Sequence, residues 1–350
     1  MKPLSGLIVG ILLTTTTYAQ EVITRISAGE HYFYYNGEIQ TAFDDATAGD
    51  TIILGGGQYT LANDVVINQR IVLIGTGARQ DSSLAYGGRT VLSGTNLIDL
   101  NIASTADGTE IHGIATENFG NVQFTTPYDA DNCRFVRCAL VGLRLGNSNL
   151  GSLADDTRIE ECIIGTLNVS RAPGTLVRNC HLGALQYAYE DSNTEVWNCI
   201  LLGIPGSNAG VHYENCIFAT ANNLATTVAE ESTYVNNLFV GNGGGFSIAF
   251  GAGATDGGNL PAETILSGPS GAFVNATSTA AYVFTDDYHV SPAYEGAGSD
   301  GTDIGIYGGQ VPWKDGGLPF NPHWTELNGP GSTNNGTLQN VIIRGSAQTH

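Results

Sequence analysis

Charged side chains and helix-forming residues are scarce in this sequence. Only 13% of its 350 residues are Asp, Glu, Lys or Arg, and lysine occurs only as Lys2 and Lys314. There is one methionine, while glycine occurs 47 times. A chain so poor in helix formers and so rich in turn formers is expected to be all-β, because long helices need the residues it lacks.

Positive charge is also in deficit. The chain has 13 Lys and Arg against 33 Asp and Glu, a formal net charge of −20. Nucleic acids and anionic membrane surfaces carry the same sign of charge and are therefore poor partners, and we expect no nucleic acid to be bound.

The N-terminus has the pattern of a secretory signal peptide. Lys2 supplies a positive charge, residues 4–13 form an apolar run, and small residues lead to Ala19. The run is too short to span a membrane, and no later run is long enough. A buried strand is the other interpretation. We expect a signal peptide at 1–19 and a soluble, exported chain that is secreted or held at the surface of a bacterial cell.

A nine-residue pattern recurs between residues 135 and 242. Examples are IEECIIGTL (159–167), VRNCHLGAL (177–185) and VWNCILLGI (196–204). The fourth position holds, in order, Cys138, Cys162, Cys180, Cys199, Cys216 and Asn237, at spacings of 24, 18, 19, 17 and 21 residues. A constant pattern at a period near 20 residues indicates a solenoid whose coils keep their strands and vary their loops.

The third position of the repeat predicts a corner. It is polar although positions 1, 4 and 6 are apolar, so a bend must separate two inward-facing stretches. Its occupants are Arg137, Glu161, Asn179, Asn198, Asn215 and Asn236. Asparagine tolerates the left-handed backbone of a one-residue corner, and its amide can bond the same amide one coil away. Arg137 and Glu161, in the first two coils, lack this preference of asparagine.

The cysteines at position 4 are expected to form a column inside the solenoid. Neighbouring coils lie about 4.8 Å apart, a distance that permits a disulfide, but parallel side chains point their Cβ atoms the same way. Buried free cysteine behaves as a small hydrophobe. A reduced ladder is therefore favoured over bridges between coils, and a tetrahedral zinc site is disfavoured by the linear arrangement.

Residues 37–77 predict how the solenoid begins. Ile39, Ala42, Phe43 and Ala46 follow helical spacing, which indicates a short amphipathic helix near 38–48. Strands are expected at 51–54, 65–67 and 71–74, with a glycine-rich turn between the first two. The helix would cover the first coil, whose core and strand edges would otherwise be exposed.

These features resemble the pectate-lyase-like superfamily. The helix, the GDTI strand, the GQY turn and the IVLIGTG strand resemble its N-terminal coils, and the N-C-hydrophobic segments resemble the parallel β-helix repeats of secreted bacterial proteins. Residues 287–309 resemble a closing segment. The likeness implies a right-handed, single-stranded parallel β-helix of roughly ten coils over 20–310, followed by an irregular tail at 311–350. The superfamily includes lyases, hydrolases, epimerases and proteins without known chemistry.

The fifth position of the repeat faces outward and is nevertheless apolar. Its occupants are Ala139, Ile163, His181, Ile200, Ile217 and Leu238. A long exposed apolar strip is unusual on a soluble monomer. We expect the tail to cover it, or a second subunit to do so by self-association.

Candidate chemistry lies in acidic loops and in arginines. Asp155, Asp156, Glu190 and Asp191 could ligate Ca²⁺ or supply paired acids, and they are equally the acids expected on loops of an acidic chain. Arg158 and Arg178 could bind a uronate or simply pair with nearby acids. Tyr128, Tyr187, Tyr189 and Trp197 are candidate sugar platforms.

Complete catalytic motifs are missing from the sequence. The paired-Asp and Gly-His-Gly patterns of polygalacturonases, the Trp-x-Asp-His pattern of pectate lyases and the Lys/Arg pair of alginate-lyase-like enzymes do not occur. Two classes remain: a non-catalytic rigid scaffold for adhesion, glycan contact or assembly, and a lyase or glycoside hydrolase acting on an acidic polysaccharide. The missing motifs favour the scaffold.

Overall fold

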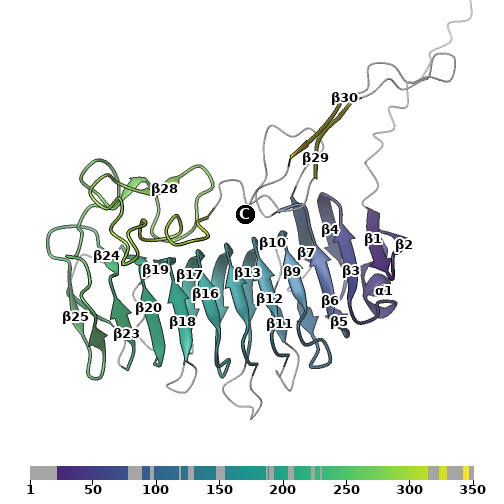
Figure 1. Ribbon diagram of the computed structural model, residues 1–350, viewed down its shortest axis with the longest axis horizontal. Helices are drawn as coiled ribbons and strands as arrows, with labels where there is room; N and C mark the ends of the chain where they lie inside the picture. The colour runs from purple at the N-terminus through teal and green to yellow at the C-terminus, as the bar shows by residue number, and fades with distance from the viewer. Residues whose placement is uncertain are drawn as a thin grey trace, which may run out of the picture.

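The computed structural model describes residues 22–77, 89–94, 98–117, 120–124, 130–146, 154–186, 188, 193–203, 209–221, 225–228, 231–313, 323–328 and 342–346. The chain is mostly β with one short helix, and it forms a parallel β-solenoid of about seven turns (Figure 1). The all-β prediction is thereby confirmed. No helix in the described part of the chain is long and apolar enough to cross a membrane.

Two 12-stranded sheets form the body of the solenoid. Sheet A consists, in spatial order, of β2 (Glu30–Tyr35), β1 (Val22–Ser27), β3 (Asp50–Leu54), β6 (Ile71–Ile74), β9 (Glu110–His112), β12 (Arg134–Val136), β14 (Arg158–Glu160), β16 (Leu176–Arg178), β18 (Thr194–Trp197), β20 (Val211–Glu214), β23 (Thr233–Val235) and β26 (Thr255–Asp256). Sheet B consists of β24 (Leu238–Val240), β21 (Ile217–Ala219), β19 (Ile200–Leu202), β17 (His181–Gln186), β15 (Ile163–Asn168), β13 (Ala139–Arg144), β10 (Ile114–Glu117), β7 (Thr90–Gly94) and β4 (Gly57–Leu61), with β5 (Val65–Ile67), β8 (Leu100–Ile102) and β11 (Val122–Phe124) alongside. A further parallel pair, β22 (Ala225–Val228) and β25 (Ser247–Phe250), belongs to the C-terminal coils.

Each repeat passes from sheet A to sheet B through a single corner residue. All six corner residues have positive φ, from 50° at Glu161 and Asn198 to 54° at Asn215. The corner prediction is confirmed even for Arg137 and Glu161, which were the uncertain cases. Their backbone is held by the neighbouring coil, since the amide of Arg137 donates to the carbonyl of Glu160 at 3.0 Å. The inner faces of the two sheets therefore enclose one continuous apolar core.

A column of thiols and amides runs through this core beside the corners. The amide of Cys138 donates to Sγ of Cys162 at 3.3 Å, and the same contact repeats from each cysteine to the next coil. The last cysteine, Cys216, donates instead to Oδ1 of Asn237 at 2.8 Å. All six cysteines are buried and free. Each ladder sulfur thus satisfies an amide that the corner turns away from the sheets.

The N-terminal end is closed by a cap. β1 pairs antiparallel with both β2 and β3, and a 3-10 turn at Asn36–Glu38 leads into α1 (Ile39–Asp44), which buries Ile39, Ala42 and Phe43. The Gln40 side chain bonds both the amide and the carbonyl of Val66 in β5, at 2.8 and 3.2 Å. The helix therefore supplies apolar cover and also pairs the free edge of β5.

The N-terminal strands largely follow the sequence pattern. β5 and β6 have the expected bounds, and β3 begins one residue earlier than expected. The expected glycine-rich turn contains β4, and the β1–β2 hairpin was not anticipated. The predicted helix is confirmed, although α1 ends at Asp44 rather than near residue 48.

Residues 265–313 form a segment, here called the cover, that packs outside the solenoid against sheet B (Figure 1). It contains the antiparallel pair β27 (Phe273–Asn275) and β28 (Asp287–Val290). Its buried side chains, among them Phe273, Tyr288 and Trp313, contact the outward residues Ile200 and Ile217. The expectation of roughly ten coils is wrong for this reason, because the last stretch assigned to coils covers a face instead of extending the axis.

The cover explains the apolar fifth position of the repeat. His181, Ile200, Ile217 and Leu238 are at most 1% exposed beneath it. Ala139 and Ile163, nearer the N-terminus, remain partly exposed. Most of the tail at 311–350 lies outside the described residues. Trp313 joins the cover, and β29 (His323–Asn328) and β30 (Ile342–Ser346) form an antiparallel pair.

The corner asparagines hold the edge of the cover. Nδ2 of Asn179 donates to the carbonyls of Ile306 and Gly308 at 2.9 and 2.8 Å. Nδ2 of Asn215 donates to Oγ of Ser299 at 3.0 Å. Nδ2 of Asn236 donates both to the carbonyl of Ala297 at 2.7 Å and to Oδ1 of Asn215 at 2.8 Å. The coil-to-coil amide bond predicted from the repeat thus occurs at Asn236 and Asn215, while Asn179 uses its amide to anchor the cover.

Candidate functional site

The outer face of sheet A carries charged side chains that are aligned from strand to strand. Phe135, Ile159 and Val177 of sheet A are fully buried, so the residues directly before and after them in each strand point outward. The register aligns two outward rows: His112, Val136, Glu160, Arg178, Trp197 and Glu214 in one, and Glu110, Arg134, Arg158, Leu176, Glu195 and His212 in the other. The rows run along the solenoid axis, one residue per strand.

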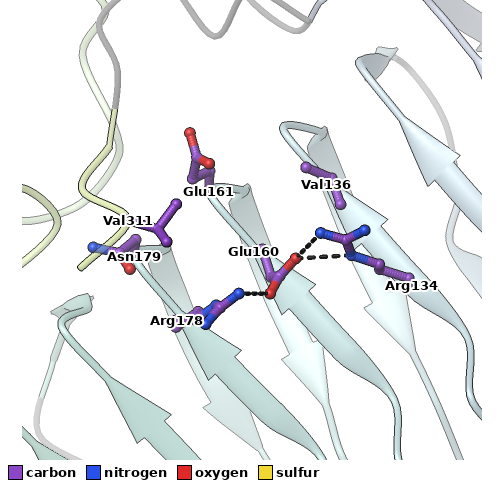
Figure 2. A pocket seen from close by; sticks show the side chains of 7 residues that line it. All are labelled: Arg134, Val136, Glu160, Glu161, Arg178, Asn179 and Val311. Atoms are coloured by element: carbon purple, nitrogen blue, oxygen red, sulfur yellow. Dashed lines mark hydrogen bonds and ion pairs between the residues drawn. The ribbon is translucent and has the colours of Figure 1, made fainter. Parts of the chain in front are cut away.

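Glu160 lies at the centre of this face, clamped between two arginines (Figure 2). Its Oε2 accepts from Nε and Nη2 of Arg134 at 2.8 and 2.5 Å, while Arg178 pairs with Oε1. The Glu160 side chain is 6% exposed, whereas each arginine is 38% exposed. Both carboxylate oxygens are therefore occupied, and the outer edges of two guanidinium groups remain open to a ligand.

A cavity of about 90 Å³ lies above this clamp, lined by Arg134, Val136, Glu160, Glu161, Arg178, Asn179 and Val311. Val311 belongs to the cover, so the cavity lies at the junction of the cover and sheet A (Figure 2). Glu161 forms a buried bidentate pair with Arg137, at 2.9 and 3.3 Å, which neutralises its charge. The cavity is therefore bordered by cations whose acidic neighbours are already paired.

Arg158 adds a third cation to this face. It follows Arg134 in the register, is exposed, and forms no ion pair with any residue that the structure describes. A guanidinium in this state keeps its planar set of donors free for a carboxylate or sulfate.

His112 and Glu110 form a second ionic group on β9. Nε2 of His112 lies 3.0 Å from Oε2 of Glu110, which also lies 3.8 Å from Nη1 of Arg134. Burial lowers the pKa of His112 below 6.5, although Glu110 opposes the shift. The imidazole is therefore neutral at pH 7 and can accept a proton.

An aromatic residue lies next to the arginines. Trp197 follows Arg178 in the register and is 37% exposed. Its ring centroid lies 5.9 Å from that of His212 on the next strand. An exposed indole beside a guanidinium combines the apolar surface and the cation that recognise an acidic sugar.

The structure separates the acidic candidates from this face. Asp155 and Asp156 lie in the turn before β14. The amide of Asp155 donates to Asp131, whose own amide donates to Asp107, at 2.8 and 3.0 Å. Burial, together with Asp131 and Asp156, raises the pKa of Asp155.

Among the described residues, no cluster of three or more His, Cys, Asp and Glu side chains could hold a metal ion. Glu190 and Asp191 lie outside the described residues, as do Tyr128, Tyr187 and Tyr189.

The sequence analysis named Arg158, Arg178 and Trp197 as candidates. It did not predict the ion pair between Arg134 and Glu160. The signal was present in the repeat: position 2 is outward and holds Glu160, Arg178, Trp197 and Glu214 in successive coils. Reading that column across coils would have predicted the ionic row.

A scan against protein-family models finds no match, and no curated protein matches the sequence. The fold itself defines the chain as a parallel β-solenoid of about seven turns. Its candidate site is the arginine-bearing outer face of sheet A, bordered by the cover.

Proposed function

We propose that this protein is a secreted or surface-held bacterial scaffold of the right-handed, pectate-lyase-like β-helix type that contacts an acidic glycan without cleaving it. The observation that carries the proposal is the gathering of Arg134, Arg158 and Arg178 on three adjacent strands. In a chain of net charge −20, such a concentration of cations provides a local site for an anionic ligand.

The rows of this face suit an extended polymer. A chain lying along the solenoid axis meets a new strand about every 4.8 Å, so carboxylates could reach successive arginines while one sugar ring stacks on Trp197. The main-chain hydrogen bonds of the solenoid hold these side chains on a rigid base, which reduces the ordering cost of binding.

The ionic pairing favours contact over catalysis. Glu160 is neutralised by two arginines, and Glu161 by Arg137. This leaves no free pair of carboxylates beside the cavity among the described residues, whereas glycoside hydrolysis requires two.

One observation favours a polysaccharide lyase as the alternative. His112 is neutral near pH 7, and its partner Glu110 lies 3.8 Å from Nη1 of Arg134. A lyase needs a base to remove the proton beside a uronate carboxylate and a cation to stabilise the resulting enolate. These two residues could supply both functions.

The test of the proposed function is glycan binding by the Arg158→Gln variant. Arg158 is exposed and unpaired among described residues, so its replacement should leave the fold intact. We expect wild type to bind alginate or pectate in calorimetry, more weakly as salt rises, and the variant to bind about tenfold more weakly. The control is Arg144→Gln on sheet B, which removes the same charge from another face and should bind like wild type.

Equal affinities of the two variants, or no binding to any acidic glycan, would refute the proposed function. An absorbance assay of wild type and a His112→Gln variant decides the alternative. Growth of the ultraviolet absorbance of an unsaturated uronate, abolished by His112→Gln, would establish a lyase and replace the non-catalytic proposal.

A further inference from the structure

His181 is the only polar residue in the apolar stripe under the cover. It lies in β17 between Ile163 and Ile200 of the neighbouring strands. Its residue exposure is 1%, and its Nε2 has no hydrogen-bond partner in the described structure. A buried polar atom without a partner costs stability, and a charge at that atom would cost much more.

The cover encloses the imidazole with aromatic rings. The ring of Tyr282 lies 4.9 Å away at 80°, and that of Tyr288 lies 5.3 Å away at 67°. Both contacts are edge-type and come from the cover. The two neighbouring strands of sheet B place Ile163 and Ile200 beside His181. The imidazole therefore has apolar neighbours in sheet B and aromatic neighbours in the cover.

The ionisable groups around His181 offer no counter-charge. The facing groups of the cover are the phenols of Tyr282 and Tyr288, and burial raises the pKa of Tyr288. Asp286 accepts hydrogen bonds from Thr277, and Asp287 pairs with His289, which stacks on Tyr307. A proton on His181 would therefore remain unpaired for as long as the cover is closed.

The cover is also one wall of the cavity over the Glu160 clamp. Val311 lines that cavity, and Asn179, which lines it too, holds the cover carbonyls of Ile306 and Gly308. Asn179 lies two residues before His181, on the other side of Cys180. Movement of the cover away from His181 would therefore displace Val311 and break the hydrogen bonds of Asn179, and both residues line the cavity.

We propose that the cover is a pH-sensitive lid, lifted from sheet B when His181 takes up a proton in mildly acidic surroundings, so that acidity regulates the glycan-contact face. The regulatory half of this inference rests on the proposed function, whereas the lifting of the cover does not.

The direction of the pH effect follows from linkage. Burial lowers the pKa of His181 to about 3, while the imidazole regains its ordinary value of 6.5 once the cover is lifted. Between these values the lifted state binds a proton that the closed state cannot, so the closed state loses stability as pH falls below 6.5. The ratio of lifted to closed cover should rise on the order of 20-fold from pH 7 to pH 5.

Hydrogen exchange of the cover tests this lid in the full chain without any glycan. The cover amides of Gly305 and Ser299 donate to the carbonyl oxygen and to Oδ1 of Asn215 on the solenoid, at 2.8 and 2.9 Å, so their protection reports closure. After correction for intrinsic rates, exchange of 265–313 should accelerate about 20-fold from pH 7 to pH 5 in wild type. Peptides from β18 and β19 should remain protected and serve as the internal reference.

Two variants and a control separate His181 from the other groups. His181→Leu matches the Leu238 that fills the stripe further on, and His181→Gln keeps a neutral polar group if leucine disturbs packing. Both should reduce the acceleration below about twofold. His289→Gln, an exposed histidine of the same cover, should behave like wild type. An unchanged acceleration in both His181 variants, or a flat wild type, would overturn the lid.

Glycan affinity at the same two pH values tests the regulation. Wild-type affinity should change between pH 7 and pH 5, and the His181→Leu affinity should change by less than twofold. An equal pH dependence in both would overturn the coupling while leaving the proposed glycan contact in place. Conversely, absence of glycan binding would refute the proposed function without affecting the exchange result.

Discussion

At the scale of the residue, the thiol ladder solves a problem created by the corner. A one-residue corner rotates the next amide out of both sheets and into the core, where it needs an acceptor. The sulfur of the next coil accepts it at 3.3–3.4 Å, and asparagine takes over where the cysteines end. Cysteine fits because its side chain is small and apolar and still accepts a weak hydrogen bond.

Replacing one cysteine of the ladder should therefore lower the free energy of unfolding by more than the loss of side-chain volume alone would. Cys199→Ala leaves the amide of Cys180 without its acceptor, and we expect a loss of about 2–4 kcal/mol in the free energy of unfolding. The control is Val196→Ala, which removes more apolar volume from the same core but no acceptor. Urea unfolding of both variants is the measurement, and a smaller loss for Cys199→Ala than for Val196→Ala would contradict the role of the rung.

At the scale of the element, a corner asparagine has two separable functions. Asn179 adopts φ of 51°, which costs a non-glycine residue about 1–2 kcal/mol, and it donates two hydrogen bonds to the cover. Asparagine adopts this backbone conformation at a lower cost than most non-glycine residues. The same residue thus shapes the solenoid and fastens a segment more than a hundred positions later in the chain.

Two substitutions distinguish these functions. Asn179→Gly keeps the positive φ and loses the bonds, so limited proteolysis within 265–313 should accelerate severalfold while the urea midpoint of the solenoid changes little. Asn179→Ala should accelerate proteolysis equally and also lower the free energy of unfolding by about 1–2 kcal/mol. If glycine and alanine give the same proteolysis and the same midpoint, the two functions are not separable.

At the scale of the whole molecule, the thiols buried along the solenoid axis together make the stability of the fold depend on pH. Burial raises the pKa of Cys133 to about 12 and holds those of Cys138, Cys162, Cys180 and Cys199 well above 9.0. Their neutral forms are required by the native state. Stability is therefore complete below pH 9 and is lost as pH rises, because the unfolded chain releases protons that the native chain retains.

This predicts an unusually steep alkaline destabilisation. Each such thiol costs about 1.4 kcal/mol per pH unit above its unfolded pKa, and five act together. The urea midpoint under reducing conditions should fall sharply between pH 9 and pH 10, before tyrosines ionise. Cys133→Ala should make the urea midpoint fall less steeply with pH, because it removes one of the five thiols that ionise on unfolding. A midpoint that stays constant up to pH 10 would show that the thiols are not buried as a group.

Much of this architecture could be predicted from the repeat and from local spacing. The nine-residue pattern indicates the solenoid, the polar third position indicates the corner, and the helical spacing of Ile39, Ala42 and Phe43 indicates the cap. The first two features depend on contacts between equivalent positions of adjacent coils, so the period carries the information, and the third follows from the spacing of apolar residues within one helix. The hairpin of β1 and β2 was missed because it precedes the repeat and pairs antiparallel.

The sequence by itself determined the coil: which residues face the core, where the chain turns, and why cysteines form a column. Only the tertiary structure decided what lies on the outer faces. It placed residues 265–313 over the apolar stripe instead of extending the axis, and it brought Arg134 and Arg178 onto the same Glu160. The physical reason is that repeat contacts join neighbouring coils, whereas the cover packs against the solenoid through residues that no period relates. The ion pairs of the outer face also depend on side-chain geometry, which the column of equivalent positions does not specify.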